Sequence, residues 1–169
     1  MGALAILALA SPAIGLVSPL PPLQQQIAAR VAASGLPQCT SYRPDGSSGP
    51  CLPTFALIAG GGVNGRSARG AITFTRGAAT RLTRDEFALL AGHEIAHWYL
   101  GHSKSSREAE LAADALGAKL ACAAGFDPAA GLGLFGYLLA DGAHPAAGER
   151  RAVVLAAACP IEVDKVDTL

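Results

Sequence analysis

Residues 93–97 read His-Glu-Ile-Ala-His, the residue types and spacing that bind a metal ion on a helix. On an α-helix, His93 and His97 lie one turn apart on the same face. Their imidazole nitrogens can therefore reach one Zn²⁺ at about 2.0–2.1 Å. Glu94 lies beside that metal position without having to bind it, so its carboxylate can accept a proton from an attacking water. The motif predicts a zinc site with a general base next to it.

A pair of acidic residues follows with the same spacing, in Glu110-Leu-Ala-Ala-Asp114. If these residues open a second helix, Glu110 can be the third ligand and Asp114 can hold a ligand histidine by its other ring nitrogen. The alternative is an amphipathic helix with two solvated histidines. Apolar residues on both flanks of the first motif argue against it, because unpartnered buried histidines are costly. We expect one Zn²⁺ per chain, held by His93, His97 and Glu110.

Two capping boxes predict where the helices that carry these motifs begin. Thr83-Arg-Asp-Glu86 predicts a helix over 84–100, and Ser105-Ser-Arg-Glu108 predicts one over 106–124 that ends at Gly125. Further patterns predict helices over 23–34, 128–140 and 147–158, and strands over 55–59 and 70–75 that form a hairpin. The fold class is therefore α+β and mainly helical, with a small β-hairpin or sheet beside the motif helix. We expect residues 23–169 to form a single domain.

The four cysteines are Cys39, Cys51, Cys122 and Cys159, and none forms Cys-x-x-Cys. Cys39 and Cys51 bracket a segment of turn residues, and closing that loop would contribute roughly 3 kcal/mol. Cys122 would then pair with Cys159, for roughly 4 kcal/mol. The alternative is four inert buried thiols. The even count and the obvious loop pair favour two disulfides and an oxidising compartment.

The N-terminal residues 1–22 are an apolar segment with two interpretations. Residues 2–17 are apolar, and Ala8-Leu-Ala10 resembles a signal-peptide cleavage site. The stretch is short for a membrane span and is interrupted by Pro12. It is either signal-like or a buried segment of the domain. We expect a periplasmic or secreted protein, with membrane anchoring by this segment as the alternative.

The charge balance argues against nucleic-acid binding. Lys and Arg together number 13, as do Asp and Glu, and the arginines are scattered along the chain. A nucleic-acid-binding domain usually carries a concentrated basic surface. We expect no nucleic-acid partner.

Four segments together resemble one peptidase class. They are Gly92-His-Glu-Ile-Ala-His97, Glu110-Leu-Ala-Ala-Asp114, Gly125-Phe-Asp-Pro128, and His144-Pro145 with Arg150 six residues after the histidine. They are similar to the HtpX and CAAX-prenyl-protease class of gluzincin zinc metallopeptidases, and more closely to its soluble periplasmic members. The resemblance covers about residues 54–155. It implies a zincin-like (minigluzincin) fold.

The resemblance also implies roles for individual residues. His93, His97 and Glu110 match the zinc ligands, Glu94 the general base, and Asp114 the aspartate behind the ligands. His144 and Arg150 match residues near the catalytic cleft, where His144 is either a transient fourth ligand or an oxyanion donor. Two departures put substrate alignment in doubt: Pro53-Thr-Phe-Ala56 lacks the usual Asn of the first strand, and the segment 63–69 is longer than usual.

These observations predict a zinc-dependent endopeptidase that acts on peptides or misfolded proteins. The strand over Ile72–Thr75, as an exposed edge, would pair with an extended substrate. A peripheral association with the bacterial envelope is compatible with this interpretation. The alternatives are an ImmA/IrrE-like regulatory peptidase and a zinc-stabilised binding or chaperone-like module with restrained or no activity.

Overall fold

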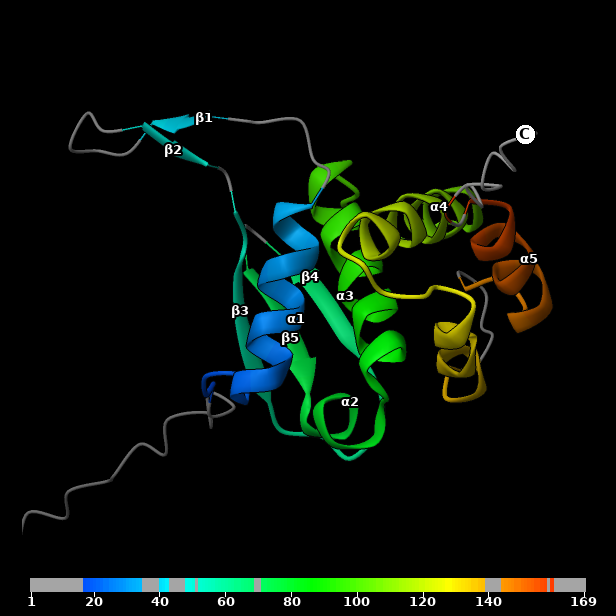
Figure 1. The fold of residues 1–169 in the computed structure, drawn as a ribbon, viewed down its shortest axis with the longest axis horizontal. Helices are drawn as coiled ribbons and strands as arrows, with labels where there is room; N and C mark the ends of the chain where they lie inside the picture. Colours follow the sequence, from blue (N-terminus) through cyan, green and yellow to red (C-terminus); the bar gives the residue numbers. More distant parts are fainter. Residues whose placement is uncertain are drawn as a thin grey trace, which may run out of the picture.

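The chain folds into a small β-sheet covered on one side by successive layers of helices (Figure 1). The computed structural model describes residues 17–34, 40–42, 48–50, 52–68, 71–138, 144–157 and 159. The helices are α1 (Pro22–Ala33), α2 (Arg76–Arg81), α3 (Arg84–Tyr99), α4 (Arg107–Ala123), the 3₁₀ helix η1 (Ala130–Gly136) and α5 (Ala147–Ala157). The strands are β1 (Thr40–Tyr42), β2 (Ser48–Pro50), β3 (Thr54–Ile58), β4 (Gly65–Ala68) and β5 (Ala71–Thr75). The expected mixed α/β class with a small sheet is confirmed.

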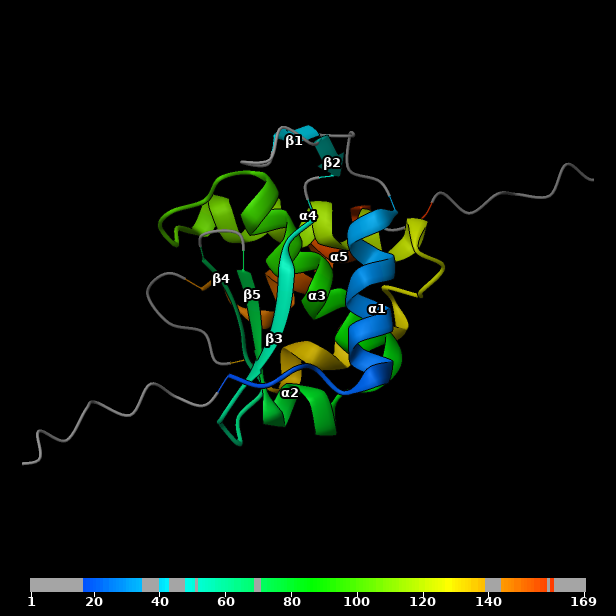
Figure 2. The ribbon, with the colours of Figure 1, turned by 90° about the vertical axis from the view of Figure 1, so that its left-hand side faces the viewer.

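The three-stranded sheet has the order β3-β5-β4, which corrects the expected hairpin (Figure 2). β3 and β5 are parallel, with Phe55 opposite Ile72, whereas β4 runs antiparallel to β5, with Gly65 opposite Phe74. The strands over 55–59 and 70–75 therefore do not form a hairpin with each other. The chain turns back after β3 and leaves room for one strand, which β5 fills. Ile72–Thr75 is consequently the centre of the sheet, and the expectation that it is an exposed edge is wrong.

The side of the sheet that faces the helices forms the core. β5 alternates, so that Ile72 and Phe74 are completely buried. The Phe74 ring lies 4.9 Å from the Phe87 ring of α3, measured between centroids. Ile95 of α3 and Leu120 of α4 extend the same cluster. The apolar side chains thus fix α3 between the sheet and α4, where its histidines are expected to act.

The caps of α3 and α4 are only partly as expected. The capping box of α3 is confirmed, because Thr83 and Glu86 exchange side-chain and backbone hydrogen bonds. The box expected at Ser105 and Glu108 is wrong. The N-cap of α4 is Ser106, whose hydroxyl accepts a hydrogen bond from the backbone N–H of Ala109. The two helices nevertheless begin and end within one residue of the expected positions.

The helix expected over 128–140 is instead the short 3₁₀ helix η1. Glycines at 131, 133 and 136 weaken an α-helix here. Two of them are needed for close packing on the first turns of α3. A Cβ on Gly131 would lie 2.9 Å from the carbonyl oxygen of Asp85, and one on Gly133 would collide with the carboxylate of Glu86.

The Cys122–Cys159 disulfide is present, with its Cα atoms 5.7 Å apart. It ties the end of α4 to the chain after α5. The pair Cys39 and Cys51 lies outside the described residues, as does most of the segment 1–22. Within the described ranges, no helix is both long and apolar enough to cross a bilayer.

Candidate metal centre

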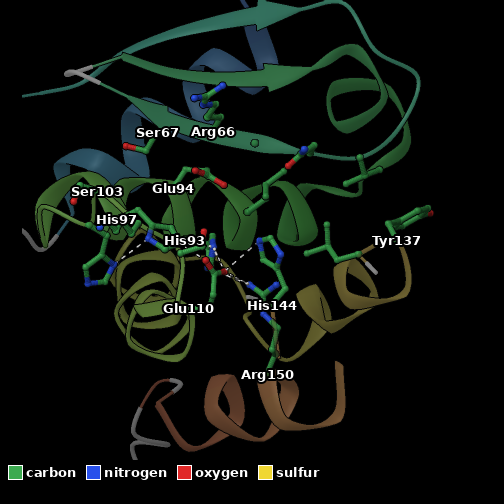
Figure 3. A pocket seen from close by; sticks show the side chains of 18 residues that line it. Arg66, Ser67, His93, Glu94, His97, Ser103, Glu110, Tyr137, His144 and Arg150 are labelled. Carbon is green, nitrogen blue, oxygen red and sulfur yellow. Dashed lines mark hydrogen bonds and ion pairs between the residues drawn. The ribbon is translucent and has the colours of Figure 1, made fainter. Parts of the chain in front are cut away.

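The centre is built where α3 and α4 cross at two glycines. A Cβ on Gly117 of α4 would lie 2.6 Å from the backbone nitrogen of His93. A Cβ on Gly92 of α3 would likewise collide with the carbonyl of Gly117. Only glycine at both positions lets the helix backbones approach this closely. The crossing brings the histidines of α3 against Glu110 of α4 (Figure 3).

His93, His97 and Glu110 point their ligand atoms at a common point. The Nε2 atoms of His93 and His97 are 3.0 Å apart. Glu110 Oε2 lies 3.4 Å from His93 Nε2, and Glu110 Oε1 lies 3.5 Å from His97 Nε2. Ligand atoms about 2.0–2.2 Å from a tetrahedral metal lie roughly 3.3–3.6 Å from one another. The separations of the two histidine nitrogens from each other and from the Glu110 carboxylate are thus close to those that one metal ion requires.

The chemistry of these donors also fits a cation. Glu110 is 1% exposed. Its Oε2 atom is buried without a hydrogen-bond partner in the part of the chain that the structure describes. A buried carboxylate oxygen without a partner is costly, and a metal ion would satisfy it. His93, His97 and Glu110 could therefore bind a metal ion.

Asp114 holds His93 from behind and is itself held by Arg150. Asp114 Oδ1 lies 2.8 Å from His93 Nδ1, so the proton on Nδ1 leaves the Nε2 lone pair free for a metal. Arg150 donates from Nε to Asp114 Oδ2 at 2.7 Å and from Nη2 to Asp114 Oδ1 at 2.8 Å. Arg150 is only 4% exposed and lies over the Phe135 ring, so it is a buried part of the centre and not a surface ion pair.

The buried charges shift the pKa values of this group. Burial alone would lower the pKa of His93, but its hydrogen bond to Asp114 and the nearby carboxylate of Glu110 raise it to about 9. Burial would raise the pKa of Asp114, but the hydrogen bonds from Arg150 and His93 hold it below its usual value. Burial would likewise raise the pKa of Glu110, but the imidazoles of His93 and His97, 3.4 and 3.5 Å away, lower it. Both carboxylates are therefore anionic, and a metal would displace the proton of His93.

The side chain of Glu94 extends from α3 towards the start of β4. Its carboxyl group is buried, and burial raises its pKa, although the neighbouring His93 and His97 counteract the shift. The strand backbone approaches it closely, since a Cβ on Gly65 would lie 2.7 Å from Glu94 Cγ and 2.9 Å from Oε1. A carboxyl group with a raised pKa is suited to both accepting and returning a proton.

His144 lies at the open side of the centre. Its Nε2 is 3.9 Å from Glu110 Oε2, and its side chain is 40% exposed. Figure 3 shows it on the same side as Glu110 and Arg150, across the pocket from the β4 residues Arg66 and Ser67. The structure thus brings together all seven residues singled out from the 93–97 motif, the 110–114 motif and the His144–Arg150 pair.

His102 also contacts a ligand histidine, and the sequence patterns did not indicate it. Its Nδ1 lies 2.9 Å from Nδ1 of His97. The signal that could have found it is Gly101-His102 directly after α3, a glycine that ends the helix followed by a residue that turns back towards it.

The ligand atoms open onto a pocket of about 510 Å³. Its walls come from β4 and the two residues before it, from α3 and α4, from the connection between these helices, from the residues that follow η1, and from His144 and Arg150. The lining residues include Asn64, Gly65, Arg66, Ser67, Glu94, His102, Lys104, Tyr137 and His144. A volume of this size lies in the range usual for ligand-binding pockets.

No protein-family model matches the chain, and no curated protein is significantly similar to it. The residues and the geometry of the site therefore carry the functional argument.

Proposed function

We propose that this protein is a zinc-dependent endopeptidase related to the HtpX and CAAX-prenyl-protease class of gluzincins. The observation that carries the proposal is the buried triangle of His93, His97 and Glu110 with Glu94 beside it, open to a large pocket. Two imidazoles and one carboxylate are the donor set of many hydrolytic zinc sites, which keep a fourth position for water. A purely structural zinc site is usually closed by a fourth protein ligand.

Glu94 would perform the proton transfers. Zinc bound to His93, His97 and Glu110 would lower the pKa of a water to about 7 and polarise the scissile carbonyl. Glu94 accepts the proton of the attacking water and later donates it to the leaving amine. Its burial raises its pKa, and a higher pKa favours the return of the proton to the leaving amine.

Three further residues support this chemistry. His144 lines the pocket near Glu110 and would donate a hydrogen bond to the oxyanion. Asp114 keeps the proton of His93 on Nδ1. Arg150 acts through Asp114, to which it donates two hydrogen bonds, and is therefore a positioning residue and not an oxyanion donor.

The substrate would be an extended peptide or a misfolded protein. β4 is one of the two outer strands of the sheet, and its backbone adjoins Glu94 through Gly65. An extended chain can add to such an edge by main-chain hydrogen bonds. β4 thus takes the role that the sequence interpretation gave to Ile72–Thr75.

A periplasmic or secreted location is part of the proposal. The Cys122–Cys159 disulfide supports an oxidising compartment and argues against a cytosolic ImmA/IrrE-like regulator. The position of His144 favours one alternative, a zinc-stabilised binding or chaperone-like module. In that case its imidazole would close the fourth metal position and restrain the activity.

Measuring bound zinc together with hydrolysis of casein tests the proposal. The wild-type protein should bind one zinc and cleave casein. Glu94→Gln should keep the zinc and lose hydrolysis, and Glu110→Ala should lose both. Wild-type zinc content without hydrolysis, together with activity gained in His144→Ala, would favour the restrained module. Unchanged turnover in Glu94→Gln would refute the mechanism.

A further inference from the structure

The two histidines of the 93–97 motif have different partners on their Nδ1 atoms. His93 is held by the carboxylate of Asp114, at 2.8 Å. His97 is held by the imidazole of His102, with Nδ1 to Nδ1 at 2.9 Å. The rings of His97 and His102 meet edge to face, with centroids 5.1 Å apart and planes at 70°. His102 follows α3 and belongs to neither sequence motif.

The end of α3 builds this contact from backbone geometry. Gly101 has a left-handed φ of +68°, and its N–H donates to the carbonyl of Trp98 at 3.3 Å. The N–H of His102 donates to the carbonyl of His97 at 3.0 Å. These two bonds are the pattern of a Schellman motif, which folds the second residue after the helix back onto its last full turn. An apolar contact commonly joins those two positions. Here they are occupied by two imidazoles in hydrogen-bonding distance.

The protons of the two rings must be complementary. A neutral imidazole that offers Nε2 to a metal carries its proton on Nδ1 and needs an acceptor for it. His97 Nε2 points towards His93 Nε2 and Glu110, so its proton belongs on Nδ1. His102 must then present a bare Nδ1 and carry its own proton on Nε2.

We propose that His102 is a positioning residue that fixes the tautomer and the ring orientation of His97 for metal binding. The proposal rests on the metal site of the proposed function but not on peptidase activity. The centre would then be asymmetric: an anionic carboxylate orients one ligand imidazole and a neutral imidazole orients the other.

Zinc affinity of the purified protein, measured by competition with a chromogenic chelator, tests this role. His102→Leu keeps the bulk but removes the acceptor, and it should bind zinc about 10–100-fold more weakly than the wild type. His102→Asn retains an acceptor oxygen and should recover most of the affinity. Tyr99→Leu is the matched control, because Tyr99 is an exposed ring three residues earlier and is not among the residues that line the pocket. It should leave the affinity unchanged.

Wild-type affinity in His102→Leu, or equal losses in His102→Leu and His102→Asn, would overturn the positioning role. A wild-type protein that binds no zinc would overturn the proposed function and this proposal together. The zinc-loaded wild-type protein gives a further test that needs no variant, from the ¹⁵N chemical shifts of its imidazoles. We expect the proton of His102 on Nε2, and a proton on His102 Nδ1 would contradict the proposal.

Discussion

Replacing Gly117 by alanine should force α3 and α4 apart at the metal centre. The added Cβ would lie 2.6 Å from His93 N, 2.7 Å from Gly92 C and 2.9 Å from His93 Cα. All three are backbone atoms, so no side-chain rotation relieves the contact. Raising the shortest separation from 2.6 Å to 3.4 Å, where ordinary contacts begin, moves the backbones apart by about 0.8 Å.

This displacement has a cost in stability and in metal binding. Overpacking of a tight contact costs about 1–3 kcal/mol, and exchanging a helical glycine for alanine returns up to about 1 kcal/mol. We expect Gly117→Ala to lower the free energy of unfolding of the zinc-free protein by up to about 2 kcal/mol. Moving Glu110 away from the 3.4 and 3.5 Å separations it has from the two histidines should weaken zinc binding about tenfold or more.

Chelator competition gives the zinc affinity, and denaturant unfolding in EDTA gives the stability without the metal. Gly148→Ala is the matched control, because Gly148 lies in α5 and a Cβ there meets no atom within 4 Å. That variant should keep its zinc affinity and be equally or slightly more stable, by at most about 1 kcal/mol. If Gly117→Ala behaves like Gly148→Ala in both measurements, the close crossing does not hold the ligands together.

Gly65→Ala should lower kcat at least tenfold with little change in zinc content, because its Cβ would displace the carboxylate of Glu94. Gly62→Ala, in the adjoining turn where a Cβ would meet no atom, should leave kcat unchanged. Equal activity of the two variants would contradict the packing argument. The double variant Cys122→Ser/Cys159→Ser should lose up to about 4 kcal/mol of stability in denaturant unfolding, and an unchanged midpoint would show that the disulfide contributes nothing. Removing zinc with EDTA should lower the Tm, with recovery on adding zinc in excess of its Kd; a Tm indifferent to zinc would mean that the folded protein does not bind it.

Local signals explain which parts of the fold were predictable. The helices that carry the metal ligands were predictable from pairs of ligand-type residues at i and i+4. The capping box was a further signal for α3. β4 was missed because Gly65-Arg-Ser-Ala68 has no apolar alternation, and a short outer strand needs none. The parallel pairing of β3 with β5 was missed for another reason. It depends on which strand fills the space between β3 and β4. That is decided by packing of the sheet against helices that are distant in the sequence.

The candidate site was predictable where residue type and spacing sufficed. The spacing of His93 and His97 already required one helix face. The crossing at Gly92 and Gly117 was not predictable, because a glycine within a helix does not indicate which other helix packs against it. The 3₁₀ form of η1 was not predictable either, because Gly131 and Gly133 are needed for contact with α3, which the sequence does not reveal.

The Cys122–Cys159 disulfide makes part of the molecule tolerant of a broken main chain. Under the proposed function and location, the protein would be exposed to proteolysis, including cleavage by its own copies. The bond spans 37 positions that include η1 and α5. A single nick within this span would yield two fragments still joined through sulfur, so that α5 with Arg150 stays covalently attached to α4 with Asp114. The two-chain product could therefore keep its buried ion pair and its ligand geometry, and the two fragments would separate on a denaturing gel only after reduction.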